Sequence, residues 1–319
     1  MNRICTLSVL LSFCISAFGG PVLIPFLRRI KFGQTVREDG PRTHLKKMGT
    51  PTMGGILILA SLVVTSLLYI EDYPEIAPVL FLTFGFGMVG FLDDYIKIAC
   101  RRSMGLTPLC KLAGQLVVTG IFAYYLLHYT DVSLAMRVPF FPGRYIDMGV
   151  LNIPILFFVV LGTANGVNFT DGLDGLAGSV TLIVAVFFAV VAVGLGNGIA
   201  PVACAVAGAL LGFLLFNVHP ASVFMGDTGS LALGGFVAAC GYMLQIPLFI
   251  AVVGLIYLAE VMSVMLQVAF FKLSGGRRLF KMAPLHHHFE LCGWPETRIV
   301  AAFTIFTAIM CLFGLMGWN

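Results

Sequence analysis

The chain has 319 residues, of which 59% are hydrophobic and only 11% are charged, and its formal net charge is +4. Soluble domains are about one quarter charged, so this composition excludes a soluble globular protein. Apolar runs long enough to cross a hydrocarbon core of about 30 Å recur from end to end. The runs are continuous rather than alternating, which favours helices over a barrel. The sequence therefore predicts an all-α integral membrane protein, with residues 1–319 forming a single transmembrane domain.

About ten spans are expected in chain order, at 4–24, 52–70, 76–92, 109–128, 150–167, 175–195, 199–217, 229–244, 247–271 and 297–317. The first apolar run is also compatible with a cleaved signal peptide, but basic residues follow it and no typical cleavage site does. We therefore expect a retained helix. The ninth run is long enough to bend and to line a lipid groove.

Basic residues predict the orientation of these spans in the membrane. Sixteen of the 19 Lys and Arg fall in alternate connections; the exceptions are Arg3, Arg137 and Arg144. Such a bias marks the cytoplasmic side, so both termini are expected in the periplasm. A basic inner face suits anionic lipids or phosphorylated substrates and gives no reason to expect nucleic acid. The one long outer connection, 129–149, carries turn-forming residues and predicts a small periplasmic hairpin.

Asp93 and Asp94 end the third apolar run, and Lys97 follows them. Carboxylates at the edge of hydrocarbon are costly and usually mark a functional site. The alternative is a solvated helix end with an ion pair to Lys97, worth a few tenths of a kcal/mol. Both interpretations remain open for this pair alone.

The segment NGVNFTDGLDGL places Asn165, Asn168, Asp171 and Asp174 at intervals of three residues. On a helix, this spacing gives neighbouring side-chain directions, and the interleaved glycines allow a close approach of backbone to a ligand. The alternative is a polar loop whose Asp residues cap the next helix. Four amide or carboxylate groups in ten residues exceed what capping requires, so we expect a binding segment.

A third cluster, FNVHPASVFMGDTGS, contains Asn217, His219, Phe224, Asp227 and Ser230. Asp227 and Thr228 are compatible with a simple helix cap, whereas the glycines on either side of them suit a turn that binds phosphate or metal.

The segment PLHHHFE contains three consecutive histidines, His286, His287 and His288. Three adjacent side chains on a strand or loop cannot all reach one ion without strain, which argues against a zinc site. We expect them to donate hydrogen bonds to an anionic substrate, with one possible acid or base among them. Lys46 and Lys111 are compatible with phosphate binding and equally with anchoring at the lipid headgroups.

These polar residues are all expected on the cytoplasmic side of the membrane. Carboxylate oxygens are the ligands that Mg²⁺ prefers, and Mg²⁺ commonly bridges to substrate phosphates. Lysines and a metal neutralise charge on a transferring phosphoryl group. The residues therefore predict a Mg²⁺-dependent phosphoryl-type transfer that involves a lipid at the inner surface.

At these residues the chain resembles the polyprenyl-phosphate N-acetylhexosamine-1-phosphate transferases over its whole length. Five motifs, KMGTPTMGG, DDYIK, NGVNFTDGLDGL, FMGDTGS and PLHHHFE, occur in the order of that family. The bacterial branch it most resembles transfers phospho-MurNAc-pentapeptide from its UDP carrier to undecaprenyl phosphate in the cytoplasmic membrane. The resemblance implies this activity, the products lipid I and UMP, Mg²⁺ as cofactor, and a homodimer.

The resemblance also implies roles for individual residues. Asp227 would be the main Mg²⁺ ligand, Asp93 a base or orienting group for the lipid phosphate, and Asp94 its support. Phosphates would be held by Lys97 and Lys111, and the catalytic cleft would be shaped by Asn165 and Asn168. The nucleoside and sugar-phosphate pocket would contain Lys46, Asp171, Asp174, Asn217 and Phe224. Gln267, His286 and His287 would contact the pyrophosphate or the sugar.

Two mechanisms remain open at this stage. In the first, which we favour, the lipid phosphate attacks directly; in the second, an Asp forms a covalent phospho-enzyme. Two other functions are alternatives: a sibling transferase and a secondary transporter. A sibling enzyme would transfer GlcNAc-1-phosphate to the same lipid, but its histidine segment differs. A secondary transporter would show repeated halves with interrupted helices, which this sequence lacks.

Overall fold

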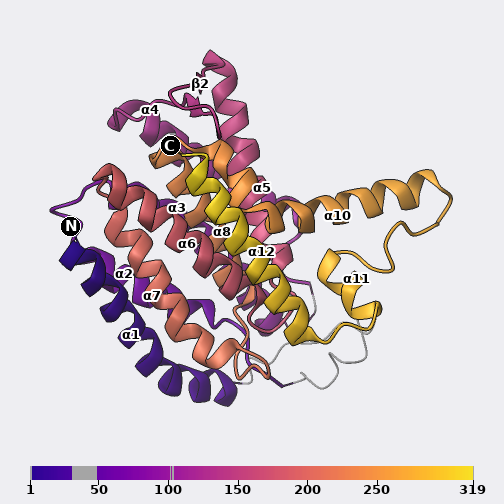
Figure 1. Ribbon diagram of the computed structural model, residues 1–319. Helices are drawn as coiled ribbons and strands as arrows, with labels where there is room; N and C mark the ends of the chain where they lie inside the picture. Colours follow the sequence, from indigo (N-terminus) through magenta and orange to yellow (C-terminus); the bar gives the residue numbers. More distant parts are fainter. Residues whose placement is uncertain (1, 31–48, 101, 103, 319) are drawn as a thin grey trace.

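The computed structural model describes residues 2–30, 49–100, 102 and 104–318 (Figure 1). Almost all of its regular structure is helical, which confirms the all-α prediction. The helices are α1 (Asn2–Arg29), α2 (Gly55–Leu67), α3 (Ile76–Ala99), α4 (Pro108–Tyr129), α5 (Asn152–Thr170), α6 (Leu176–Leu195), α7 (Ala200–Asn217), α8 (Gly226–Met243), α9 (Ile250–Val253), α10 (Leu255–Leu273), α11 (Leu285–Leu291) and α12 (Glu296–Met316). Two short 3₁₀ helices, η2 (Gly149–Leu151) and η3 (Pro247–Phe249), precede α5 and α9.

Each expected span corresponds to a helix, but not every helix has the length and apolarity of a membrane span. Within the described residues, eight helices do: α1, α3, α4, α5 with η2, α6, α7, α10 and α12. Helix α2 has only 13 residues, and α8 begins with the polar residues Asp227 and Thr228. A count of ten crossings and the periplasmic position of both termini therefore stay predictions. The bend expected in the ninth run is present, because Gly254 separates α9 from α10.

Helices α7 and α8 form the centre of the bundle. α8 packs against α3 and α5, and α7 packs against α1 and α6. From Thr228 to Met243 every residue of α8 is buried. Its many Ala and Gly residues let neighbouring helices come close, which is how helices associate in lipid, where the hydrophobic effect does not drive them together. Figure 1 shows α10 extending outward from this bundle, with α11 below it.

The first helix is integrated into the bundle along its length. It runs without interruption from Asn2 to Arg29 and lies beside α7 (Figure 1). The Ser12 hydroxyl donates to the Ala205 carbonyl oxygen at 2.7 Å, and the backbone of Val9 fills the space where Gly208 has no side chain. This packing supports a retained helix rather than a signal peptide.

The contact between α1 and α7 should be sensitive to one added methyl group. A Cβ at Gly208 would overlap the carbonyl oxygen of Val9, which is backbone and cannot turn aside. We expect Gly208→Ala to destabilise the protein by roughly 1–3 kcal/mol, as overpacking does. Gly162→Ala is the matched control, since nothing lies within 4 Å of that Cβ. Thermal unfolding in detergent measures both; equal midpoints would contradict the close packing.

The hairpin expected between 129 and 149 is confirmed. Strands β1 (Met136–Arg137) and β2 (Tyr145–Ile146) pair antiparallel, with Met136 opposite Ile146. The Arg137 side chain donates to the backbone carbonyl of Trp318 and stacks on its ring, 3.9 Å from the centroid. The hairpin is thereby held to the end of α12, at the top of the bundle in Figure 1.

Candidate active site

Three carboxylates meet where the end of α3 lies against the start of α8. Asp93 and Asp94 are on the last turns of α3, and Asp227 is in the first turn of α8. Carboxylate oxygens of the three residues lie within 4.8 Å of one another. Asp93 and Asp94 are each only 3% exposed. The helices approach this closely because position 90 is glycine: a Cβ there would overlap the carbonyl oxygen of Asp227.

Two lysines bind this carboxylate cluster. Lys97 Nζ lies 2.6 Å from Asp93 Oδ2, 2.8 Å from Asp227 Oδ2 and 3.7 Å from Asp94 Oδ1. Lys111 Nζ, from the first turn of α4, lies 3.1 Å from Asp227 Oδ2. The ion pair expected within α3 is therefore present, but it is only one contact of a network that joins three helices. A solvated helix end does not describe this site.

Backbone and hydroxyl groups hold the carboxylates of α3 in place. Asp94 Oδ2 accepts hydrogen bonds from the Thr228 amide at 2.9 Å and from the Thr228 hydroxyl at 2.8 Å. Asp93 Oδ1 accepts from the Leu106 amide at 2.8 Å. Thr228 therefore ties α8 to α3, and neither it nor Asp227 is the N-cap of α8, which is Met225.

Amide side chains of α5 form one wall of the site. Asn168 Nδ2 donates to Asp227 Oδ1 at 2.9 Å and to the Ser230 hydroxyl at 2.8 Å. One turn earlier, Asn165 Nδ2 donates to Gln115 Oε1 at 3.0 Å. Gln115 is on α4 and only 1% exposed. Asn168 thus touches the carboxylate cluster directly, whereas Asn165 braces α5 against α4.

A fourth carboxylate, Asp171, belongs to the same electrostatic cluster. Burial, followed by the charges of Asp227, Asp94 and Asp174, raises the pKa of its carboxyl well above the ordinary value. Four acidic groups thus share the site with two ammonium groups. Hard carboxylate oxygens in this number are the donors that Mg²⁺ selects, so the residues fit that ion, with Asp93, Asp94 and Asp227 as the closest set.

Two of the sequence motifs are joined by backbone hydrogen bonds. The Phe224 amide donates to the Pro51 carbonyl, and the Gly54 amide donates to the Phe224 carbonyl, both at 2.8 Å. Gly226 has a positive φ of +72°, and a Cβ there would come within 2.6 Å of Asp94 Oδ2. The glycines of both motifs thus let the chain turn tightly beside the carboxylates. Lys46 lies outside the described residues.

Asp174 and Asn217 lie in a second polar cluster. Helix α5 ends at Thr170, so Asp174 does not continue the face of Asn165 and Asn168, contrary to the helical spacing. Asp174 Oδ2 lies 3.2 Å from His219 Nδ1, and Glu296 Oε2 lies 3.4 Å from the same nitrogen. Asn217 Oδ1 accepts from the Gly175 amide, and its Nδ2 donates to the Val223 carbonyl.

The three histidines lie on α11, and each has a different partner. His286 is 1% exposed, and its Nδ1 lies 3.2 Å from Glu260 Oε2 on α10. His287 Nδ1 lies 2.6 Å from Glu290 Oε2. His288 Nδ1 accepts from the Lys281 amide at 3.2 Å. The three side chains thus contact three different groups.

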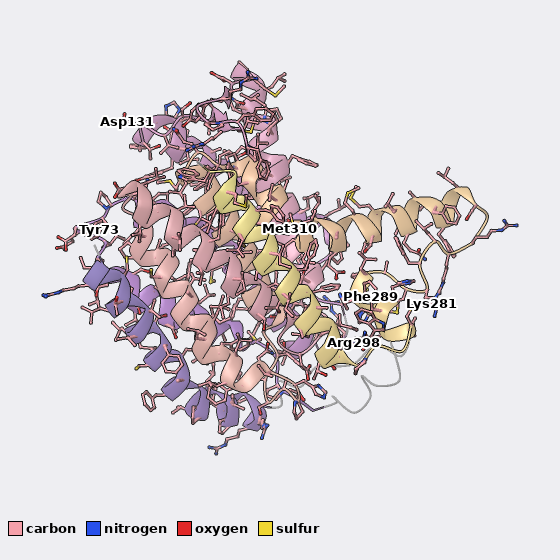
Figure 2. All side chains as sticks on the ribbon, viewed as in Figure 1. Tyr73, Asp131, Lys281, Phe289, Arg298 and Met310 are labelled. Carbon is pink, nitrogen blue, oxygen red and sulfur yellow. The ribbon has the colours of Figure 1, made fainter. Side chains whose placement is uncertain are left out.

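Gln267 holds the segment that leads into α11. Its Oε1 accepts from the amides of Leu279 and Phe280 at 3.1 and 2.8 Å. It also lines a groove of about 390 Å³ beside α10, together with Phe271, Lys272 and Arg278. Figure 2 shows this region from the side: Lys281, Phe289 and Arg298 lie together near α11, and Asp131 lies at the opposite end of the molecule.

The structure brings seven of the sixteen expected residues into one cluster and adds partners that the sequence analysis did not single out. Asp93, Asp94, Lys97, Lys111, Asn168, Asp171 and Asp227 form the cluster itself. The missed residues are Gln115, Glu260 and Glu296. For Glu260, an acid within an otherwise apolar span was the available signal; Gln115 and Glu296 are ordinary residues of a helix face and a first helical turn.

Comparisons with known proteins agree with this arrangement. The sequence model of glycosyl transferase family 4 matches residues 76–245, and signature 1 of phospho-N-acetylmuramoyl-pentapeptide-transferase matches residues 47–59. Three curated proteins named phospho-N-acetylmuramoyl-pentapeptide-transferase illustrate the likeness. That of Clostridium kluyveri is 49% identical, over 97% of this chain and 98% of its own. That of Acetivibrio thermocellus is 49% identical, over 97% and 93%.

The third, from Clostridioides difficile, is 48% identical over 98% of this chain and 97% of its own length. The similarity extends over nearly the whole of both chains. It therefore includes the regions of the carboxylate cluster, the second polar cluster and α11. The chain belongs to the phospho-N-acetylmuramoyl-pentapeptide-transferases, a branch of glycosyl transferase family 4.

Proposed function

We propose that this chain transfers phospho-MurNAc-pentapeptide from UDP-MurNAc-pentapeptide to undecaprenyl phosphate, giving lipid I and UMP, at the cytoplasmic face of the bacterial inner membrane. The observation that carries the proposal is the cluster of Asp93, Asp94 and Asp227 with Lys97 and Lys111 at one end of an apolar helix bundle. Such a site can hold phosphates and a divalent cation beside the lipid phase. The names of its relatives support the substrates.

The lysines are suited to hold the reacting phosphates. Lys97 and Lys111 both reach Asp227, yet their side chains remain 32% and 20% exposed, so each can donate to a phosphate on the open side. A phosphate monoester has its second pKa near 6, so the lipid phosphate is already largely an anion at neutral pH. The chain therefore needs to position this nucleophile and screen its charge rather than deprotonate it.

The contacts of Asp93 and Asp94 favour direct attack over a covalent phospho-enzyme. Asp94 Oδ2 accepts two hydrogen bonds from Thr228, and the Asp93 oxygens bind Leu106 and Lys97. The partners of each carboxylate lower its nucleophilicity, while its remaining lone pairs can still bind a metal. Asp93 then orients the lipid phosphate through Lys97, and Asp94 holds α8, with Asp227, in register.

We propose Mg²⁺ as the cofactor, held chiefly by Asp227 with Asp93 or Asp94 as the second ligand. The excess of three carboxylates, Asp93, Asp94 and Asp227, over two lysines supports a divalent cation here. When bound, Mg²⁺ would stabilise charge on the pyrophosphate and the transferring phosphoryl group. Asn168 fixes the Asp227 carboxylate through Oδ1, so that Oδ2 faces the lysines.

The remaining substrate contacts are proposed around this centre. Asp171, Asp174, Phe224 and Lys46 would line the nucleoside and sugar-phosphate pocket, with Asn217 shaping it, since both groups of that amide are already bonded to backbone. His287 and His288 would face the sugar or pyrophosphate from α11, and Gln267 would hold the segment before it. We also propose a homodimer, as the family resemblance implies.

The direct test is UMP release by the purified protein in detergent. It is given undecaprenyl phosphate and either UDP-MurNAc-pentapeptide or UDP-GlcNAc, with Mg²⁺ or with excess chelator. We expect UMP only from the muramoyl substrate and only with Mg²⁺. UMP from UDP-GlcNAc would instead indicate the sibling GlcNAc-1-phosphate transferase. Absence of UMP from both, with folded protein, would contradict the proposed reaction.

A further inference from the structure

A buried acid–histidine pair joins α10 to α11. Glu260 is 0% exposed and lies within α10, one of the candidate membrane spans. Its Oε2 lies 3.2 Å from His286 Nδ1, and its Oε1 accepts from the His286 backbone amide at 3.3 Å. An acid buried at this depth is costly unless it is paired. Here both carboxylate oxygens face the same residue, although Oε2 and Nδ1 are not aligned for a hydrogen bond.

The backbone contact makes Glu260 the cap of α11. The first turn of a helix has amides without partners inside the helix, and the N-cap of α11 is Pro284, which provides no side-chain bond. Glu260 supplies the missing acceptor from another helix, and its negative charge suits that end of the helix dipole. Glu260 is therefore one of the contacts that fix α11, beside the packing of Phe289 on Trp294 and Phe303.

The other side of the His286 ring faces the active site. A Cβ at Gly172 would overlap Nε2 of His286, so the ring packs against the turn that follows Asp171. That nitrogen is buried and has no hydrogen-bond partner among the described residues. Asp171 in turn belongs to the cluster of Asp227 and Asp94. Direct contacts thus run from Glu260 through His286 to the Asp171–Gly172 turn, and the Asp171 carboxyl interacts electrostatically with those of Asp227 and Asp94.

We propose that Glu260 is a positioning residue for the transfer reaction, acting through His286 on the Asp171–Gly172 turn. The inference rests on the proposed function, because it assigns a role within that site. Glu260 itself is too deeply buried to meet substrate. Its contacts with His286 fix the position of the imidazole ring. The ring in turn limits how closely the Asp171–Gly172 turn can approach Asp227. Displacements of about 1 Å in such supports can cost 10²-fold in rate.

The experiment is a double-mutant cycle on UMP release. Glu260→Gln keeps the shape and removes the charge, and His286→Gln removes the ring. We expect each to lower kcat by about 10-fold or more with little change in KM. The double variant should be no slower than the slower single variant, because both changes break the same connection. If the loss of kcat in the double variant equals the product of the two single losses, the inference is overturned. A wild-type kcat in Glu260→Gln would also overturn it.

Two further variants separate positioning from a general loss of folding. Gly172→Ala leaves the Glu260 and His286 side chains unchanged, but its added methyl group would overlap Nε2 of His286. It should therefore lower kcat, as the Glu260 and His286 variants do. Ser263→Ala is the control: Ser263 is also buried in α10, and its hydroxyl donates to the Glu260 carbonyl oxygen at 2.7 Å rather than to the Glu260 side chain. It should keep the wild-type kcat. Gly172→Ala with wild-type kcat would overturn the proposed path.

Each variant is compared at equal folded protein, measured by size-exclusion chromatography and thermal unfolding. If Glu260→Gln does not fold, Glu260→Asp replaces it in the cycle, since it keeps the charge and shortens the reach by one methylene group. The wild type serves as the reference for the reaction itself. Wild-type protein without UMP release contradicts the proposed function, whereas an active wild type with an unaffected Glu260 variant contradicts only this inference.

Discussion

Asp227→Asn should reduce UMP release on the order of 10²–10³-fold, the loss expected when one preorganised charge is removed from a reacting centre. The substitution is isosteric, so Asn168 retains a partner of the same shape. It removes the negative charge with which both Lys97 and Lys111 form ion pairs. Lys97 would keep its ion pair with Asp93, whereas Lys111 would lose its ion pair with Asp227, and the proposed metal would lose its main ligand.

Asp131→Asn is the matched control for this substitution. Asp131 is exposed and lies at the opposite end of the molecule from α11 (Figure 2), so the same chemical change there should leave kcat and KM unchanged. Both proteins are assayed at saturating substrates with a thermal unfolding measurement. An Asp227→Asn enzyme with more than about one tenth of wild-type kcat would contradict the central role of this carboxylate, on the magnitudes above.

Gly90→Ala should also cause a large loss of activity, on the order of 10²-fold. A Cβ at this position would overlap the carbonyl oxygen of Asp227 and crowd the Thr228 amide. These are backbone atoms, so α8 must shift away from α3, and Asp227 must then move relative to Asp93 and Asp94. The free energy of unfolding should fall by roughly 1–3 kcal/mol, as at other overpacked sites. This loss should affect UMP release less than the displacement of Asp227 does.

Two comparisons distinguish lost geometry from lost stability. Gly120→Ala in α4 adds the same methyl group with only an ordinary contact, 3.8 Å from Phe157, and should retain activity. Gly208→Ala should destabilise the bundle at α1 and α7, away from the carboxylates, and keep its kcat per folded molecule. If Gly90→Ala and Gly208→Ala lose activity equally at equal folded protein, then the approach of α3 to α8 has no special role.

Most elements of the fold were predictable because the long helices coincide with apolar runs, whereas the short helix α11 forms in the histidine segment, which the sequence analysis treated as a strand or loop. The position of Asp93 and Asp94 at the end of an apolar run also indicates a functional role from the sequence alone. Helix ends were less certain: α5 stops at Thr170, so Asp171 and Asp174 leave the helix whose spacing they continue. The break at Gly254 similarly divides a run that reads as one span.

What the sequence could not supply is which helix ends meet. Lys97 and Asp227 are 130 residues apart, yet they form a contact of 2.8 Å. That contact depends on the close approach of α3 and α8 at Gly90. In a membrane protein with many glycines, one glycine in the sequence does not indicate that two helices meet there. Gln115 and Glu260 were missed for a related reason. Each is a polar residue within a largely apolar helix, and its importance depends on its partner from another helix.

Asp93, Asp94 and Asp227 are proposed to hold a divalent cation beside Lys97 and Lys111. Mn²⁺ binding followed by electron paramagnetic resonance tests it without any turnover. The wild type should bind Mn²⁺ saturably, and Mg²⁺ should displace it. Asp227→Asn should lose this site, and Asp131→Asn should keep it. Equal, Mg²⁺-competed binding by the wild type and by Asp227→Asn would contradict the claim.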